Sequence, residues 1–343
     1  MGYFTNVRNV IFLTTALGCC SANHARRCVG GSEAYVCTLH QFKYEPGEDI
    51  PLFDLHPDTK EVRFVTSFYK PRTQSITVYD AVLHRQLGMP IAVEITDSMM
   101  TSLELPPNLQ YGDFASNQLS GLVVDPNQSY ALRYLNLNGN YGLRPENVSH
   151  FTALETLHMS SCRFQSIPAE LFAKVTRLQH LTISSNNLHE LDLKTLPGSL
   201  TLLWMDRNLL PKLNFEDVRF PQLEDLNVQR NELTAMNISV LVERSPKLKL
   251  FSIGHNPISI EKLDHIVSVL NRHNISYYSM ENPEDWTCSE SEVRIRGICI
   301  PKDSVRPGWG EWLTQIFFFC LVPLVLFGAA LSGWLLWRKF QTK

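Results

Sequence analysis

Cysteine and histidine are the residue types in this chain that could carry chemistry. The 343-residue sequence contains 8 cysteines and 11 histidines. It has no C-x-x-C pair and no H-E-x-x-H run, and we find neither a nucleophile motif nor a glycine-rich phosphate loop. We therefore expect no enzymatic activity, no bound metal and no cofactor.

Two histidines fall where they could meet. We expect His158 and His180 on adjacent strands of a sheet, as diagonal neighbours on one face. A pair of imidazoles placed in this way could act as a pH switch or hold a metal ion. Solvated surface histidines are far commoner, so that alternative stays open.

Four cysteines flank a long leucine-rich region. Cys28 and Cys37 precede it, and Cys288 and Cys299 follow it. The economical pairing joins Cys28 to Cys37 and Cys288 to Cys299, which closes a small cap at each end of the region. Cys162 lies within the region, and we expect it to stay reduced.

Between the two cysteine pairs the sequence repeats every 22–25 residues on the template L-x-x-L-x-L-x-x-N-x-L. The position of the template Asn is filled in seven successive units, by Asn117, Asn140, Cys162, Asn186, Asn208, Asn231 and Asn256. The unit around Asn117 is weaker, because Gly112 stands in an apolar position. The stretch from Val62 to Leu87 is expected to be irregular, and its register cannot be assigned from the sequence.

The sequence predicts an α/β fold: the repeat predicts a solenoid, and one transmembrane helix is expected from the C-terminal segment 316–337. Each unit holds one short strand and cannot bury its leucines alone, so neighbouring units must stack into a curved parallel sheet with an irregular or helical convex face. The template Asn sits where the chain leaves the strand, and its amide can bond backbone groups from one repeat to the next. Cys162 can donate through its thiol at the same place. Helical spacing from Ile260 to Leu270 predicts a helix on the convex side.

The strand register also predicts the residues of the concave face, because successive strand side chains alternate sides. Most of them are polar, but Leu202, Trp204 and Leu250 are apolar, a composition typical of a protein-binding hot spot. The alternative that Trp204 merely covers its neighbouring strands stays open. Our candidate partner-binding residues are Tyr134, His158, His180, Leu202, Trp204, Asp206, Asp225 and Leu250.

The two ends of the chain carry targeting signals. Residues 1–22 have the order of a secretory signal peptide. Residues 316–337 contain no charged side chain and are followed by Arg338 and Lys339, which predicts a membrane helix with a cytoplasmic tail over 338–343. We expect a single-pass type I protein of the plasma membrane. Its remaining parts are an N-terminal cap over 23–61, repeats over 62–283, and a C-terminal cap and stalk over 284–308.

Four N-x-S sequons, at Asn127, Asn147, Asn237 and Asn274, become glycosylation candidates if the chain is secreted. The net charge of −3 gives no reason to expect a nucleic-acid partner. Gly328 with Ser332, small residues four apart, would let a second membrane helix approach. The candidate partners are a protein ligand or a membrane co-receptor. The chain could also form homo- or hetero-dimers through its ectodomain or its membrane helix.

The spacing from Ile167 through Leu171 to Leu178 resembles the common extracellular class of leucine-rich repeats. With the small N-terminal cysteine cap and the lone membrane helix, the chain is similar to the transmembrane branch of the mosquito leucine-rich repeat immune proteins. The secreted members of that family carry a coiled coil after the repeats, and this chain has no such heptad run there. The resemblance implies pathogen defence and a complement-like thioester protein as partner. The alternative is an adhesion or developmental co-receptor.

Overall fold

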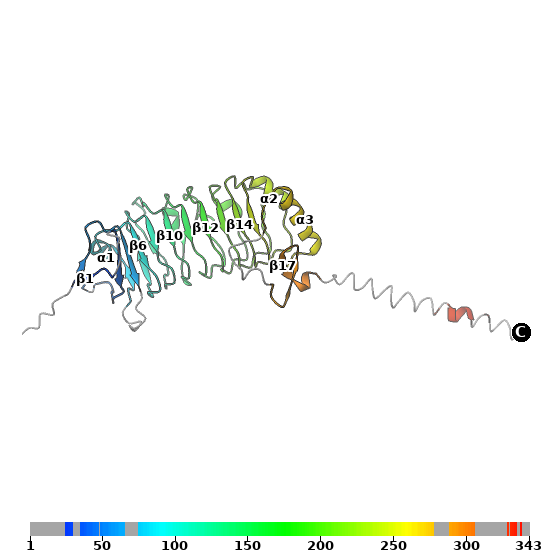
Figure 1. Cartoon of the computed structure of the whole chain (residues 1–343), viewed down its shortest axis with the longest axis horizontal. Coiled ribbons are helices and arrows are strands. Elements are labelled where there is room, and N and C mark those ends of the chain that lie inside the picture. Colours follow the sequence, from blue (N-terminus) through cyan, green and yellow to red (C-terminus); the bar gives the residue numbers. More distant parts are fainter. Residues whose placement is uncertain are drawn as a thin grey trace, which may run out of the picture.

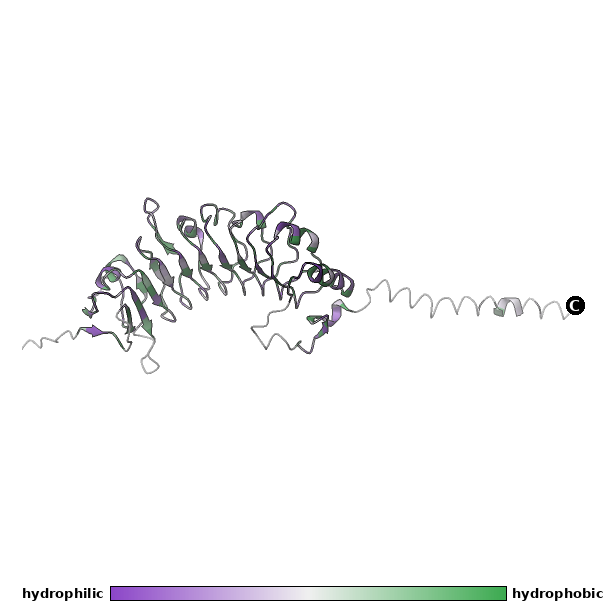
Figure 2. Cartoon of the chain, turned by 45° about the horizontal axis from the view of Figure 1, so that its top comes forward, coloured by the Kyte–Doolittle hydropathy of each residue, from purple (hydrophilic) through white to green (hydrophobic). Residues whose placement is uncertain are grey.

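The computed structural model describes residues 25–29, 35–47, 49–65, 75–277 and 288–305, together with 328, 330–334 and 337. Over the described range the chain forms an elongated solenoid built on one long parallel sheet (Figure 1). Figure 2 shows the arch of the solenoid, with strands along its inner side and turns and helices on its outer side. This is the architecture that the repeat predicts.

Ten strands form the long sheet, in the order β15-β14-β13-β12-β11-β10-β8-β6-β4-β2. Every neighbouring pair is parallel, so each repeat adds one strand beside that of the repeat before it. The strands are β2 (Val36–His40), β4 (Glu61–Val65), β6 (Ala92–Ile95), β8 (Tyr111–Asp113), β10 (Tyr134–Asn136), β11 (Thr156–His158), β12 (His180–Thr182), β13 (Leu202–Trp204), β14 (Asp225–Asn227) and β15 (Leu250–Ser252).

The remaining elements lie outside the long sheet. A three-stranded sheet joins β5 (Val78–Tyr79), β7 (Ser102–Glu104) and β9 (Leu122–Val123). Helices occur at α1 (Ala81–Gln86), α2 (Ile238–Arg244) and α3 (Ile260–Arg272), with 3-10 turns η1 (Glu146–His150), η2 (Leu193–Thr195) and η4 (Lys302–Ser304). Helix α3 confirms the predicted helical spacing, because it buries Leu263, Ile266 and Leu270 on one face.

The template Asn residues form the predicted hydrogen-bond ladder. Asn208, which is 4% exposed, donates its Nδ2 to the carbonyl of Met205 in its own repeat and to that of Ile183 in the repeat before, both at 3.0 Å. Its Oδ1 accepts the backbone N–H of Leu188 at 3.1 Å. One side chain therefore satisfies backbone groups of two repeats that the bend leaves unpaired.

Cys162 takes the same place in its repeat. Its Sγ donates to the carbonyl of Leu137 at 3.3 Å, the contact that Asn140 makes to Phe114 one repeat earlier. Burial raises the pKa of the Cys162 thiol to about 11, so the sulfur keeps its proton and remains a donor. The thiol is unpaired and buried, as predicted.

The residue before each of these seven positions has a left-handed backbone, with φ between 52° and 74°. This conformation turns the chain out of the strand and aims the following Asn or Cys into the solenoid. It costs a residue with a Cβ roughly 1 kcal/mol or more, and glycine least. Glycine nevertheless appears once in the series Ser116, Gly139, Ser161, Ser185, Arg207, Arg230 and His255.

The first repeats depart from the template, which is why the sequence did not reveal their register. From Val36 the aligned positions advance by 25, 31 and 19 residues to Tyr111, and afterwards by 22–25. In place of Asn, Ser98 and Gln41 carry the ladder, and Gln41 donates its Nε2 to the carbonyl of Thr96 at 3.0 Å. The long sheet therefore begins at β2, inside the segment expected to be an N-terminal cap.

Glycine at position 112 has a steric cause. A Cβ there would lie 2.6 Å from the ring of Phe114, closer than real Cβ contacts allow. The ring of Phe114 is fully buried. It fills the space taken in the next repeat by Leu135, the residue aligned with Gly112. The weak match of this unit to the template is thus a local exchange of volume between two core positions.

Both expected disulfides are present, one at each end of the solenoid. Cys28 bonds Cys37, which lies on strand β2 at the open edge of the long sheet. Beside it, β1 (Arg26–Arg27) pairs with β3 (Phe53–Asp54). Cys288 bonds Cys299, which lies on β17 of the antiparallel hairpin β16 (Glu292–Ile295) and β17 (Ile298–Pro301). Ile298 and Ile300 are buried, so the hairpin covers apolar surface at the other end.

No helix in the described parts of the chain is long and apolar enough to cross a membrane. The segment predicted to do so, 316–337, lies outside the described residues except for 328, 330–334 and 337, which are helical. The predicted signal peptide, 1–22, and the tail, 338–343, also lie outside them.

Candidate binding surface on the concave face

The concave face carries two straight rows of side chains that run across all ten strands. The parallel register aligns the first row as Val36, Glu61, Ala92, Tyr111, Tyr134, Thr156, His180, Leu202, Asp225 and Leu250. The second row, two residues further along each strand, is Thr38, Arg63, Glu94, Asp113, Asn136, His158, Thr182, Trp204, Asn227 and Ser252. Neighbours within a row are about 4.8 Å apart at the backbone.

The predicted apolar patch differs from the expectation in one respect. Leu202 and Leu250 are not on neighbouring strands, because Asp225 of β14 stands between them in the first row. Trp204 lies in the second row on β13, diagonal to Asp225 in the first row on β14. It donates its indole N–H to the Oδ2 of Asp225 at 3.1 Å. Leu202, Trp204 and Leu250 are each half-buried. The patch is therefore an apolar rim around a carboxylate, which we call the Trp204 patch: Leu202, Trp204, Asp225 and Leu250.

Asp206 lies beside this patch and is already engaged. Its Oδ1 accepts a short hydrogen bond, 2.5 Å, from the hydroxyl of Ser184 on the neighbouring repeat. The hydroxyl of Ser160 continues the line by accepting the backbone N–H of Ser184 at 3.1 Å. The ladder holds Asp206 in place, and its side chain is half-buried.

The two histidines bond threonines rather than each other. Nδ1 of His158 lies 2.9 Å from the hydroxyl of Thr182, and Nδ1 of His180 lies 3.4 Å from that of Thr156. Burial lowers the pKa of His158, with the nearby charge of Asp113 opposing the shift, so the neutral ring is favoured. The contacts support a satisfied surface pair more than a metal site.

Tyr134 belongs to an aromatic cluster that the sequence did not predict. Its ring stacks on that of Tyr111 with centroids 4.1 Å apart and 5° between the planes. The edge of His158 meets the other side of Tyr134 at 5.4 Å. Tyr134 was expected on the concave face, but only the exact register of β8 against β10 shows that its ring pairs with that of Tyr111.

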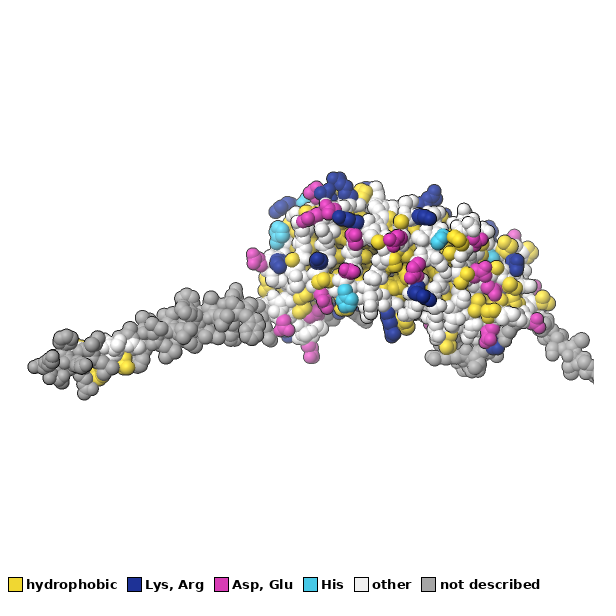
Figure 3. All heavy atoms as spheres, turned by 180° about the vertical axis from the view of Figure 1, so that it is seen from behind, with side chains coloured by type: hydrophobic (Ala, Val, Ile, Leu, Met, Phe, Trp, Pro, Cys, Tyr) yellow, Lys and Arg dark blue, Asp and Glu magenta, His cyan; other side chains and the backbone are white. Residues whose placement is uncertain are grey.

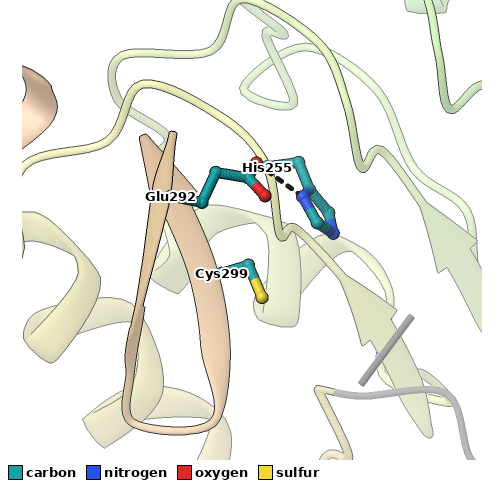
Figure 4. Close-up of side chains that lie close together, drawn as sticks. All are labelled: His255, Glu292 and Cys299. Atoms are coloured by element: carbon teal, nitrogen blue, oxygen red, sulfur yellow. Dashed lines mark hydrogen bonds and ion pairs between the residues drawn. The ribbon is translucent and has the colours of Figure 1, made fainter. Parts of the chain in front are cut away.

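A histidine, a carboxylate and a cysteine also meet at the C-terminal cap (Figure 4). Ligand atoms of His255, Glu292 and Cys299 lie within 4.8 Å of one another. The sulfur of Cys299 is bonded to Cys288, so it has no thiolate to offer a metal. What remains is a hydrogen bond of 2.7 Å between Nδ1 of His255 and Glu292, which ties the last repeat to hairpin β16–β17.

The four sequons lie away from the concave rows, as expected, but their surroundings differ. Asn127, Asn237 and Asn274 are exposed. Asn147 is half-buried in η1 and donates its Nδ2, the atom a glycan would occupy, to the carbonyl of Leu122 at 2.7 Å.

On the face shown in Figure 3, acidic and basic side chains are interspersed rather than gathered by sign.

The chain is similar to curated proteins over part of its length. The chain is 27% identical over 221 residues to "Transforming growth factor beta activator LRRC33" of Danio rerio, covering 64% of this chain and 29% of that protein. It is 31% identical over 126 residues to "Probable inactive serine/threonine-protein kinase roco10" of Dictyostelium discoideum, covering 35% of this chain and 5% of that protein. It therefore spans less than a third of either relative. No family model matches.

Among solved structures, a chain of the LRIM1/APL1C complex matches with a TM-score of 0.53 and 15% identity. The match covers 89% of this chain and 57% of the other. At this identity the likeness concerns the fold, which is a parallel-sheet solenoid in both.

Proposed function

We propose that this chain, a leucine-rich repeat protein, acts as a cell-surface recognition protein. Its concave face is proposed to bind a protein or pathogen-derived ligand. One observation carries the proposal: the two rows of side chains cross ten strands in register, and half-buried aromatic and polar groups stand in them. Rigid strands hold these groups in fixed positions, which lowers the entropy cost of binding.

The Trp204 patch is the proposed centre for a protein partner. Trp and Leu supply apolar area, and the bond to Asp225 fixes the indole before any partner arrives. Tyr134, His158, His180 and Asp206 extend the proposed surface along the same face.

Two features support an extracellular location. Disulfides close both ends of the solenoid, and disulfides persist in oxidising compartments. Three of the four sequons are exposed. With the targeting signals expected over 1–22 and 316–337, we propose a single-pass type I protein of the plasma membrane.

The proposed role is that of an innate-immune receptor or co-receptor. The structural likeness is to a chain of a complex between two proteins, LRIM1 and APL1C, which supports partnering with a second protein. The resemblance to the mosquito immune family extends the proposal to a complement-like thioester protein as partner. The alternative role, a developmental or adhesion co-receptor, is favoured by the name of the Danio rerio relative, an activator of a growth factor.

The experiment is to crosslink the full chain on living cells and identify the captured proteins. Capture should fall when Trp204 is replaced by Ala and persist when the exposed Tyr141, outside both concave rows, is replaced by Ala. Recovery of the same partner at the same yield from both variants would reject the concave patch as the binding surface. Induction of the transcript by microbial challenge would favour immunity, and strict neural or muscle expression would favour adhesion.

A further inference from the structure

The stacked tyrosines leave one ring face uncovered by the row. Tyr134 covers one side of Tyr111, and Tyr111 is still 37% exposed. Its opposite side is turned toward strand β6, where the register places Ala92. Ala92 contributes only a methyl group, so the neighbouring side chain of the first row can cover little of that face of Tyr111.

Carboxylates surround this face. Glu61 follows Ala92 in the first row, while Glu94 and Asp113 lie in the second row on the strands of Ala92 and Tyr111. Among the described residues of these strands, Arg63 is the cation beside them: it bonds Glu61 and lies 3.6 Å from Glu94. Within this described group, three carboxylates and one guanidinium leave a net charge of about −2 beside the ring of Tyr111.

Among the described residues, the hydrogen-bond partners of Asp113 are neutral. Its Oδ1 accepts the backbone N–H of Ala115 and its Oδ2 accepts the amide of Asn136, each at 3.1 Å. Burial raises the pKa of Glu94, and repulsion from Asp113 raises it further against the opposing effect of Arg63. A positive charge at this place would relieve that repulsion.

We propose that Tyr111, Glu94 and Asp113 form a binding site for the cationic side chain of a Lys- or Arg-bearing segment of a protein partner. An aromatic face beside carboxylates suits this ligand, because the ring quadrupole attracts a cation and the carboxylates accept its N–H donors. The inference deepens the proposed function by naming the chemistry of a partner, and it rests on the concave face being a partner surface. The site is four strands away from Trp204, roughly 19 Å at the usual strand spacing.

The test measures fluorescence anisotropy of labelled peptides with the purified full chain in neutral detergent. The probes are (Gly-Arg)6 and (Gly-Lys)6, with (Gly-Glu)6 and fully acetylated (Gly-Lys)6 as controls. The two basic peptides should bind, with a Kd that rises steeply with salt. No binding of either basic peptide, or equal binding of (Gly-Glu)6, overturns the proposal.

Variants then place the site. Glu94→Gln with Asp113→Asn should raise the Kd at least tenfold, whereas Glu170→Gln with Glu232→Gln, an equal charge change at exposed positions outside the two rows, should leave it within twofold. Equal effects of the two pairs would reduce the binding to net charge and overturn the site. Thermal unfolding checks that each variant folds.

A second comparison isolates the ring. Tyr111→Ala should raise the Kd several-fold, and Tyr111→Phe should leave it near the wild-type value because the aromatic face remains. If millimolar Ca²⁺ displaces the basic peptides equally well from wild type and from Tyr111→Ala, the carboxylates bind an inorganic cation without the ring. That result would overturn the proposal. Peptide binding at this site with cellular capture unaffected by Trp204→Ala would reject the Trp204 patch alone. Loss of capture without peptide binding would reject the cation site alone.

Discussion

The indole N–H of Trp204 and the Oδ2 of Asp225 are joined by a hydrogen bond of 3.1 Å between strands β13 and β14. This bond satisfies the one polar atom of the indole, so the rest of the ring offers only apolar surface. A carboxylate in the middle of an apolar patch thus positions the ring instead of interrupting the patch.

We predict that Trp204→Ala weakens partner binding by about 2 kcal/mol, the scale of a hot-spot residue. Trp204→Phe should cost less, because it keeps most of the apolar area and loses only the indole N–H. Titration of the partner identified by crosslinking measures both. Tyr141→Ala removes an exposed ring outside the concave rows and serves as the matched control. If Trp204→Ala and Tyr141→Ala bind equally well, the patch is not the site.

The Asn ladder makes a prediction about stability. Asn208→Ala removes a donor and an acceptor that serve buried backbone groups of two repeats, so the free energy of unfolding should fall by about 2–4 kcal/mol. Asn208→Cys should cost less, because Cys162 shows that a thiol keeps the donor contact. Urea denaturation compares the three proteins. Equal losses for Ala and Cys would show that the donor contact does not matter.

The link between His255 and Glu292 predicts an acid-dependent stability. Burial alone would raise the pKa of Glu292, but hydrogen bonds from His255 and Ser289 outweigh it and hold the pKa below its ordinary value. A lowered folded-state pKa stabilises the protein above the unfolded value, about 4.3, and this contribution is lost as pH falls through the folded pKa.

Glu292→Gln should therefore lower the unfolding temperature at pH 7, and its difference from wild type should shrink as the pH falls from about 5 to 3. Differential scanning calorimetry across this range measures it. The neighbouring exposed Glu290 provides the control, and Glu290→Gln should leave the profile unchanged. A difference for Glu292→Gln that stays constant down to pH 3 would rule out the carboxylate as its source.

Glycan occupancy should differ among the sequons. We expect glycans on the exposed Asn127, Asn237 and Asn274, and little or none on Asn147, whose Nδ2 is held by the carbonyl of Leu122. Mass spectrometry of peptides released with glycosidase in heavy-oxygen water reads each position separately. Full occupancy of Asn147 would mean that the glycan is attached before η1 forms.

The repeat fold could be predicted from the sequence because one Asn position recurs with a nearly constant spacing. No register could be assigned over Val62 to Leu87, where a repeat of 31 residues contains helix α1 and the ladder on either side uses Gln41 and Ser98 instead of Asn. A template search weighs residue identity at fixed spacing, whereas the fold requires only a buried polar group that reaches the same backbone atoms.

The concave face was predicted in part for a related reason. Alternation along a strand shows which residues lie on the concave face, so Tyr134 and Trp204 were placed there correctly. Which of them touch depends on the order of strands and on side-chain rotamers. That Asp225 separates Leu202 from Leu250 and that Glu94 lies beside Asp113 therefore became visible only in the structure.

The straight rows across the sheet also set a length scale that a partner must match. Their step is about 4.8 Å, whereas side chains on one face of an extended peptide recur every 6.6 Å or so and the turns of an α-helix every ~5.4 Å. An extended partner laid along the arch falls out of phase with the repeats after about one strand, and a helix after a few. Because these periods do not match the 4.8 Å step, a partner laid along the arch would contact the rows only at separate points where the spacings coincide. Inserting or deleting one repeat between two such points would change the distance between them, so such a partner would lose one of the two contacts.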